Sequence, residues 1–106
     1  MFARRVYMHL KPNSVAEFTG KLEKDVIPTL RKQKGFQDEI TFIAPSGTEA
    51  FAISLWDRPE SAEAYHRGSY PELAKILATV IEGPPQVETF NVANSTFHKI
   101  AAAVAV

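Results

Sequence analysis

The fold of this 106-residue chain is decided by residues 49–66, which read EAFAISLWDRPESAEAYH. Larger apolar residues alternate with smaller ones up to Trp56, and this period of two is typical of a β-strand. Pro59 follows at a position in the first helical turn where its missing N–H costs no hydrogen bond. The Ala- and Glu-rich residues after it favour a helix. We therefore predict a strand that runs directly into a helix, with Asp57 or Arg58 as its N-cap.

The segments before this junction predict a strand, a helix and a second strand. Residues 2–11 alternate and form the first strand. Ser14 and Glu17 have the spacing of a capping box and begin a helix. Pro28 should kink this helix or begin a second segment, and Gly35 should end it. Residues 36–44 form the next strand. The turn residues 45–48 join it to the strand 49–56 as a hairpin.

The segments after the junction complete a repeated pattern. Gly68 ends the first helix, Pro71 begins another, and residues 83–85 (Gly-Pro-Pro) end that one before a last strand at about 86–97. The order β-α-β-β-α-β is that of the ferredoxin-like α+β fold. This fold has a four-stranded antiparallel sheet with helices on one face. We expect one domain over residues 1–106, with 98–106 as an apolar C-terminal tail.

Composition excludes several classes of partner. Twelve basic and twelve acidic residues give zero formal net charge, so we expect no nucleic-acid partner. No apolar run is long enough to cross a membrane, so we expect no membrane association. The absence of cysteine excludes disulfides and thiolate chemistry and fits a reducing compartment, so we expect a cytoplasmic protein. The three histidines have no metal-binding spacing, so we predict no metal site.

The sheet face that carries no helices needs a cover. The strand 49–56 places Phe51, Ile53 and Leu55 on one side and a mixed set of small, weakly polar and aromatic residues, Ala52, Ser54 and Trp56, on the other. We take the mixed side as the uncovered one. An exposed face of this kind marks an interface or a ligand groove. We predict a homodimer in which two sheets pack face to face and close an α/β barrel. The tail either extends the last strand toward the partner or frays.

At this point the residues resemble a family, the antibiotic biosynthesis monooxygenase domain. The resemblance rests on residues 51–57 followed by 60–65, on residues 11–13 followed by Glu17 and Phe18, and on Ile27-Pro28 leading to Gly35-Phe36. It covers about residues 4–93. It implies the dimeric α+β barrel, but it is not specific for activity. The family is similar across cofactor-free quinone-forming monooxygenases, haem-degrading enzymes and members of no known role.

The haem-degrading branch fits the resemblance poorly. Trp56 and His66 are ten residues apart, as the Trp and His of that branch are. However, the Trp of that branch lies within the helix, which corresponds to a place near Tyr65 here. Its strand asparagine is replaced by Arg5 or Val6. Haem degradation is therefore the least favoured functional hypothesis, and we expect no cofactor.

The first strand offers a candidate catalytic trio. Arg5, Tyr7 and His9 share one face at the spacing of alternate strand residues. A neutral histidine can remove a proton from a phenol, and Arg5 or Tyr7 can stabilise the resulting anion. The competing interpretation places these side chains at a wet edge or in the interface. A pocket lined by the opposite face, with Val6 and Met8, would argue against the trio.

Four further residues are candidates for binding an aromatic small molecule. Trp56 ends its strand and either forms an aromatic wall or anchors the strand–helix junction with its indole bonded locally. Tyr65 and His66 point about 100° apart on their helix, so one faces inward. Asn91 bonds either a ligand or its counterpart across a dimer. The adjacent acids Asp38 and Glu39 are interpreted as solvated or capping charges.

Two functional hypotheses remain. The first is a small cofactor-independent monooxygenase that acts on an aromatic or polycyclic phenol or quinol. The second is a non-catalytic dimeric module that binds a hydrophobic small molecule. The fold alone does not choose between them, since one scaffold hosts unrelated activities.

Overall fold

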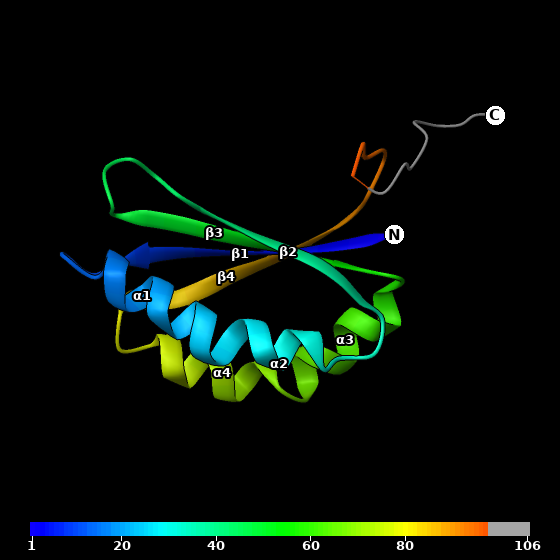
Figure 1. Ribbon diagram of the computed structural model, residues 1–106, viewed down its shortest axis with the longest axis horizontal. Coiled ribbons are helices and arrows are strands. Elements are labelled where there is room, and N and C mark those ends of the chain that lie inside the picture. Colours follow the sequence, from blue (N-terminus) through cyan, green and yellow to red (C-terminus); the bar gives the residue numbers. More distant parts are fainter. Residues whose placement is uncertain (98–106) are drawn as a thin grey trace.

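The computed structural model describes residues 1–97, and predictions for the tail at 98–106 lie outside the described residues. Figure 1 shows a single antiparallel sheet with helices on one side of it. The strands lie in the order β2-β3-β1-β4. Along the chain, the elements are β1 (Phe2–Leu10), α1 (Val15–Lys21), the π-helical turn η1 (Leu22–Val26), α2 (Ile27–Arg31), β2 (Phe36–Ile43), β3 (Glu49–Trp56), α3 (Pro59–Arg67), α4 (Tyr70–Leu77) and β4 (Ile81–Asn91). The predicted ferredoxin-like α+β fold is confirmed.

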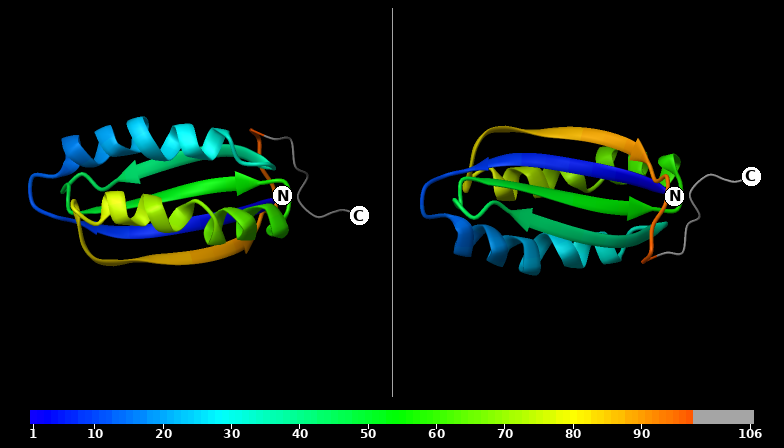
Figure 2. Two further views of the ribbon diagram at one scale, coloured as in Figure 1. Left: turned by 90° about the horizontal axis from the view of Figure 1, so that it is seen from below. Right: turned by 90° about the horizontal axis from the view of Figure 1, so that it is seen from above.

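The helices form two rods on one face of the sheet. Figure 2 shows the rod made by α1, η1 and α2 beside the rod made by α3 and α4, and its other view shows the opposite face without helices. The edge strand β4 extends past the second rod. This uncovered margin of the sheet is where a pocket forms.

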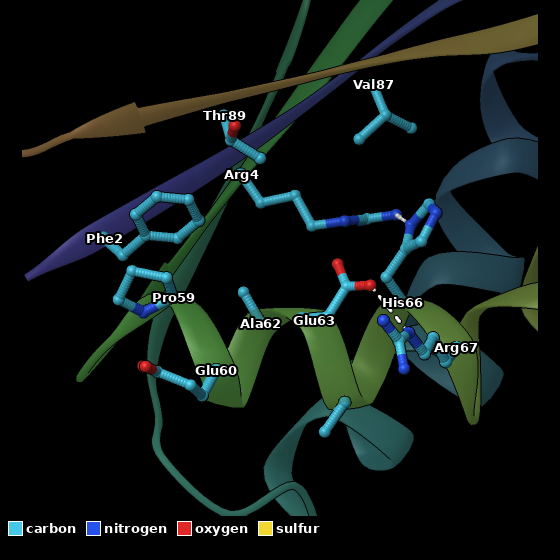
Figure 3. Close-up of a pocket in the computed structure, with 11 residues that line it drawn as sticks. Phe2, Arg4, Pro59, Glu60, Ala62, Glu63, His66, Arg67, Val87 and Thr89 are labelled. Atoms are coloured by element: carbon cyan, nitrogen blue, oxygen red, sulfur yellow. Dashed lines mark hydrogen bonds and ion pairs between the residues drawn. The ribbon is translucent and has the colours of Figure 1, made fainter.

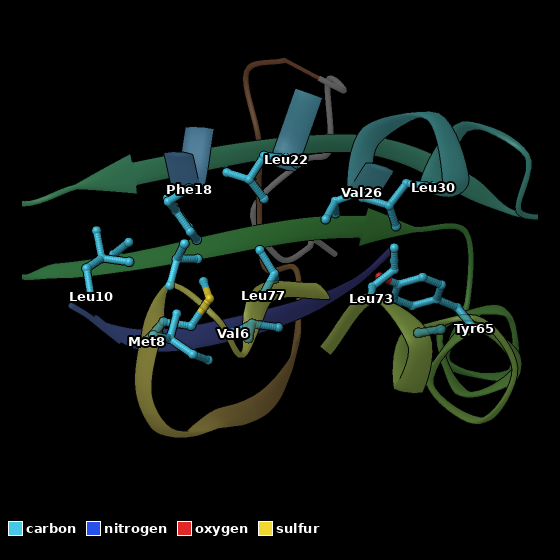
Figure 4. Packing of buried hydrophobic residues seen from close by; sticks show 14 of the residues in the cluster. Val6, Met8, Leu10, Phe18, Leu22, Val26, Leu30, Tyr65, Leu73 and Leu77 are labelled. Atoms are coloured by element: carbon cyan, nitrogen blue, oxygen red, sulfur yellow. The ribbon is translucent and has the colours of Figure 1, made fainter. Parts of the chain in front are cut away.

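The core lies between the sheet and the two rods (Figure 4). Leu73 and Leu77 of α4 and Phe18 and Leu22 of the first rod point toward the strands, as their helical spacing requires. Phe18 and Trp56 have no exposed surface. Burial of one such side chain stabilises the fold by about 2–3 kcal/mol, so this layer holds the helices on the sheet.

Pro28 stands at the beginning of a second helical segment, α2, which is one of the two outcomes that the sequence predicted for it. The backbone widens by one residue in η1, where the Ile27 N–H donates to the Leu22 carbonyl, five residues back. Pro28 then stands in the first turn of α2, where its missing N–H costs little. A single wide turn thus absorbs the proline and keeps the rod continuous.

The last strand begins earlier and ends earlier than predicted. It spans Ile81–Asn91 and therefore includes Gly83-Pro84-Pro85, which the sequence suggested as a break before the strand. The pairing register shifts between Tyr7 and His9, so these three residues form an irregularity in the ladder. Prolines are tolerated there because β4 is an edge strand, whose outward N–H groups need no partner.

The assignment of the sheet faces in β3 is reversed in the structure. The helices cover Ala52, Ser54 and Trp56, while Phe51, Ile53 and Leu55 lie on the face without helices. The register explains this result. Arg4 pairs with Ser54 and Val6 with Ala52, so the side of β1 that meets the helices meets them together with the small residues of β3. Small residues let the helices approach the sheet closely.

Gly35 links the end of the first rod to the beginning of α3. Its φ of 83° lies in the left-handed region, and a Cβ there would overlap the side chains of Asp57 and Ser61. Its carbonyl accepts the Asp57 N–H at 2.9 Å. A hydrogen bond with the Ser61 hydroxyl lowers the pKa of Asp57. The close approach that only glycine permits therefore fixes where α3 starts.

Candidate functional site

An open pocket of about 680 Å³ lies on the helix face of the sheet, between α3 and the strands β1 and β4 (Figure 3). Its volume is in the range of small-molecule sites. The strands contribute four side chains and α3 contributes the rest: Phe2, Arg4, Val87 and Thr89, with Pro59, Glu60, Ala62, Glu63, Ala64, His66 and Arg67. The pocket exists because α3 covers β3 and β1 but leaves β4 open.

A polar row crosses the helix face of the sheet beside this pocket. Arg4 pairs with Ser54 on one side and with Thr89 on the other, and Ser54 pairs with Glu39 of β2. The four residues therefore stand in register across all four strands. The next row is apolar or weakly polar, with Thr41, Ala52, Val6 and Val87. The sequence thus places one line of polar groups within a layer that otherwise packs against helices.

Arg4 is the central feature of the row. Arg4 is only 3% exposed, and among residues 1–97 no carboxylate forms an ion pair with its guanidinium. Its guanidinium carbon lies 4.1 Å from the Tyr70 ring centre and 5.2 Å from that of Tyr65. Burial removes water from the guanidinium and lowers the pKa of Arg4. These cation–π contacts offset part of that cost.

His66 lies against Arg4 and its tautomer follows from that contact. Arg4 Nη2 donates to His66 Nδ1 at 3.0 Å, and a guanidinium has only donors. Nδ1 must therefore carry a lone pair, and the ring proton is on Nε2. The His66 ring also stacks on Tyr70 at 5.4 Å between centroids. The site accordingly presents a fixed cation and a neutral imidazole, whose Nε2–H is a hydrogen-bond donor.

A second, smaller cavity lies behind Arg4, deeper between the sheet and the helices. Its volume is about 40 Å³. Apolar side chains from β1, β3, the first rod and α4 form most of its wall, and Arg4, Ser54 and Glu39 of the polar row line it as well. Burial raises the pKa of Glu39, although a hydrogen bond from the Thr41 hydroxyl opposes this effect. Among residues 1–97, Arg4 is the one residue that lines both this cavity and the open pocket.

Because Tyr65 is buried, the free energy of unfolding depends on pH in the alkaline range. Burial raises its pKa from 10.0 to about 12. The folded protein therefore keeps a proton that the unfolded chain releases above pH 10, so stability is complete below pH 10 and falls as pH rises toward 12. We expect a loss of about 2–3 kcal/mol in the free energy of unfolding over that range. Urea denaturation at several pH values measures it, and Tyr65→Phe should remove this part of the loss. An unchanged loss in the variant would contradict the assignment.

The predicted trio lies on the other face of the sheet. Arg5, Tyr7 and His9 are together there, with the rings of Tyr7 and His9 at 5.2 Å edge to face. Arg5 forms an ion pair with Glu88 at 2.6 Å, and its guanidinium lies 4.7 Å from the Phe51 ring centre. None of the three lines either pocket described above, whereas Val6 and Met8 line the inner one. Their catalytic role stays a prediction.

The four predicted binding residues are placed differently from one another. His66 lines the open pocket and Tyr65 the inner cavity. Trp56 has no exposed surface, lines neither pocket and donates its indole N–H to the Ser54 hydroxyl at 2.8 Å, as an anchor of the junction would. Asn91 is exposed at the end of β4, paired with Phe2, and lines neither pocket. The structure therefore brings both Tyr65 and His66 into contact with Arg4 and leaves Asn91 apart from them.

Sequence reasoning missed Arg4, Glu39 and Tyr70. One signal for Arg4 was available: it is the charged residue among Phe2, Val6, Met8 and Leu10 on the apolar side of the first strand. A charge at an inward position of a strand has to be paired or functional. Glu39 was interpreted as a solvated charge, but the register shift between Phe36 and Asp38 turns it toward the helices.

Within residues 1–97, no three His, Asp or Glu side chains group closely enough to hold a metal. No described helix is long and apolar enough to cross a bilayer.

No family model matches the chain, and no curated protein matches its sequence. Solved structures do match it. The ActVA-Orf6 monooxygenase of Streptomyces coelicolor, in complex with nanaomycin D, has a TM-score of 0.76 at 16% identity over 89% of this chain and 88% of that one. The cofactor-independent oxygenase SnoaB from Streptomyces nogalater has a TM-score of 0.73 at 12% identity over 90% and 95%. A protein from Bordetella bronchiseptica, whose name assigns it to the antibiotic biosynthesis monooxygenases, has a TM-score of 0.73 at 13% identity over 86% and 95%.

These identities are too low to carry an activity, but the agreement covers nearly the whole of both chains. This chain has the ferredoxin-like α+β fold of the antibiotic biosynthesis monooxygenases.

Proposed function

We propose that the protein is a cofactor-independent monooxygenase that oxidises an aromatic or polycyclic phenol or quinol bound in the open pocket. One observation carries the proposal: a buried arginine without a carboxylate partner in the described chain stands in the wall of a pocket large enough for such a ligand. A buried charge is costly until it is paired. A substrate that becomes a phenolate would supply the missing negative charge.

The proposed oxidation requires little from the protein besides a positive charge close to the substrate anion. An electron-rich phenolate or enolate reacts with dioxygen itself, so the protein has to favour the anion and orient it. Arg4 favours the anion by electrostatic attraction, because its guanidinium is buried in the wall of the pocket and is shielded there from water. The Nε2–H of His66 can donate to a second oxygen of the substrate, and the stacked rings of His66 and Tyr70 stiffen this side of the pocket.

The similar structures support the proposal without establishing it. One of them is a monooxygenase in complex with nanaomycin D, and another is a cofactor-independent oxygenase. Both share the arrangement of sheet and helices that forms the pocket here. Because fold alone does not determine reaction, the argument rests on Arg4 and its surroundings.

An oxygen electrode tests the activity directly. Purified protein, free of metal and flavin, is given a panel of anthrone- and quinol-type compounds, and oxygen uptake with quinone formation above background is expected. If a compound raises the melting temperature but no product forms, the non-catalytic binding module is correct instead. If no compound in the panel causes oxygen uptake and none raises the melting temperature, both functions are rejected.

The same assay tests the trio on the other face of the sheet. If catalysis takes place at Arg5, Tyr7 and His9, then His9→Ala and Tyr7→Phe will lower turnover sharply while Arg4→Met will not. If it takes place in the open pocket, the reverse result is expected. The two faces are separated by the sheet, so one set of variants decides between them.

We also propose that the face without helices is covered by a second copy of this chain. That face carries exposed large apolar residues, with Ile40 at 47%, Phe42 at 43% and Phe90 at 48% exposure, and the rings of Phe42 and Phe51 stack at 4.9 Å. Phe51, Ile53 and Leu55 continue the apolar surface between them. The face thus combines an apolar patch with the polar side chains of Arg5, Tyr7, His9 and Glu88. An exposed patch of this kind marks an interface, and a twin sheet would match it in shape.

Sedimentation equilibrium at micromolar concentration is expected to show a dimer. Phe42→Asp places a charge in the apolar patch that Phe42 forms with Phe51 and should weaken association at least 100-fold, because a carboxylate cannot be desolvated there without a partner. Phe97→Asp is the matched control, since Phe97 is 81% exposed and lies beyond β4. A monomeric wild type, or equal association of both variants and wild type, would contradict the proposed interface.

A further inference from the structure

Two glutamates of α3 line the open pocket, and their carboxylates are placed differently. Figure 3 shows the carboxylate of Glu63 pointing from the helix toward Arg4, whereas that of Glu60 points away from it. Burial lowers the pKa of Arg4, and the negative charge of Glu63 is among the influences that oppose this effect. Glu63 therefore stands close to the cation that would stabilise a substrate anion.

The carboxylate of Glu63 is held through one of its two oxygens. Arg67, one turn along α3, donates from Nε to Glu63 Oε2 at 2.7 Å. Within residues 1–97, the other oxygen, Oε1, accepts no hydrogen bond. The side chain of Glu63 is 54% exposed, so a proton that it receives can pass on to water. An oxygen in a fixed position, with a lone pair to spare and a route to solvent, meets the requirements of a general base.

Among the described residues of the pocket wall, the other side chains are poor bases. Arg4 donates to His66 Nδ1, so that lone pair is occupied and the ring proton of His66 is on Nε2. Neither ring nitrogen can then take a proton from a substrate. The two arginines of the wall are cations, the hydroxyl of Thr89 is a weak base, and Glu60 points away from Arg4. Glu63 is the group that remains.

We propose that Glu63 is the general base that removes the proton whose loss converts the bound substrate into an anion. The proposal rests on the monooxygenase function proposed above. In an anthrone-type compound, a C–H bond of the ring methylene breaks, its electron pair passes to the carbonyl oxygen as an enolate, and the proton forms an O–H bond on Glu63. The negative charge moves from Glu63 to the substrate, so the net charge near Arg4 does not change. A carboxylate can remove a proton from carbon where the site stabilises the enolate.

Hydrogen exchange in the absence of oxygen isolates this proton transfer from the oxidation. Anthrone is incubated with the protein in D₂O under anaerobic conditions, and NMR follows the loss of the methylene proton signal. We expect the wild type to accelerate exchange above the buffer rate, and Glu63→Gln to lower the accelerated rate about 100-fold. Glu72→Gln is the matched control, because Glu72 also forms an exposed helical ion pair, with Lys75 at 3.3 Å, and lines neither pocket. It should exchange at the wild-type rate, and both variants should have similar melting temperatures.

Chemical rescue distinguishes a base from a structural side chain. Glu63→Ala should lose exchange as Glu63→Gln does, and added formate should restore part of the rate, because it supplies a carboxylate in the vacated space. Formate should not accelerate the wild type. The proposal is overturned if the wild type exchanges no faster than buffer, if Glu63→Gln exchanges at the wild-type rate, or if the loss occurs in Glu60→Gln instead.

The same proteins separate this proposal from the proposed oxidation. If the wild type consumes oxygen with anthrone, and Glu63→Gln exchanges the proton and consumes oxygen equally fast, the base is wrong and the monooxygenase function stands. If the wild type exchanges the proton, Glu63→Gln does not, and no compound of the panel is oxidised in air, Glu63 is the base and the monooxygenase function fails.

Discussion

Arg4→Met is expected to lower kcat/KM for a phenolic substrate by about 10²–10³-fold, the usual effect of removing one group that stabilises developing negative charge. The guanidinium is buried at the wall of the open pocket and has no carboxylate partner in residues 1–97. Methionine fills similar space without charge, so the pocket should keep its shape. Steady-state oxygen uptake and product formation measure the loss.

A measurement of stability distinguishes a role of Arg4 in stabilising the substrate anion from a role in holding the fold together. If Arg4 served mainly to hold the fold, Arg4→Met would lower the melting temperature. Since a desolvated cation without a carboxylate costs free energy, we expect the variant to be as stable as the wild type or more stable. Arg31→Met on α2 is the matched control and should change neither quantity, because Arg31 is exposed and lines neither pocket. If Arg4→Met keeps full activity, the proposal that catalysis takes place in the open pocket is wrong.

The second large effect is on stability. Trp56→Ala is expected to lower the free energy of unfolding by about 3–5 kcal/mol, because a fully buried indole leaves a cavity when it is truncated. The ring contacts Phe36 at 5.6 Å and Tyr65 at 5.2 Å between centroids, so it joins β2, β3 and α3. Trp56 is the single tryptophan of the chain, so the variant has no tryptophan fluorescence with which to follow unfolding. Circular dichroism in urea is therefore the appropriate measurement.

Trp56→Phe tests the alternative that the indole forms a wall for the ligand. It keeps most of the apolar contact and loses the hydrogen bond to Ser54, so it should cost less stability than Trp56→Ala. Because Trp56 lines neither pocket, turnover should stay within about twofold of the wild type. A large loss of turnover with little loss of stability would favour the aromatic wall instead.

Much of the fold could be predicted from local patterns. Alternation defined β1 and β3, the turn residues before Glu49 defined the hairpin, and Pro59 marked the beginning of α3. These signals succeed because they reflect backbone geometry within a few residues. The same local reasoning failed at β4, where Gly83-Pro84-Pro85 suggested a break. Only the position of that strand at the sheet edge makes the prolines acceptable there.

The candidate site was harder to predict than the fold. Tyr65 and His66 were identified, but Arg4 was overlooked and the pocket was expected on the side of Arg5, Tyr7 and His9. Alternation shows which residues share a face and not which face the helices cover. In β3 both faces are apolar enough to be buried, so the pattern could not decide between them.

The amino-acid sequence by itself determined the order of the elements, the pairing of β2 with β3 as a hairpin, and the grouping of side chains on each strand face. Those properties depend on contacts between near neighbours in the chain. The tertiary structure alone decided which face received the helices and thereby buried Arg4 beside His66, 62 residues away. The reason is packing: the helices settle where the small residues of β3 let them approach, and the charge of Arg4 is buried with that face.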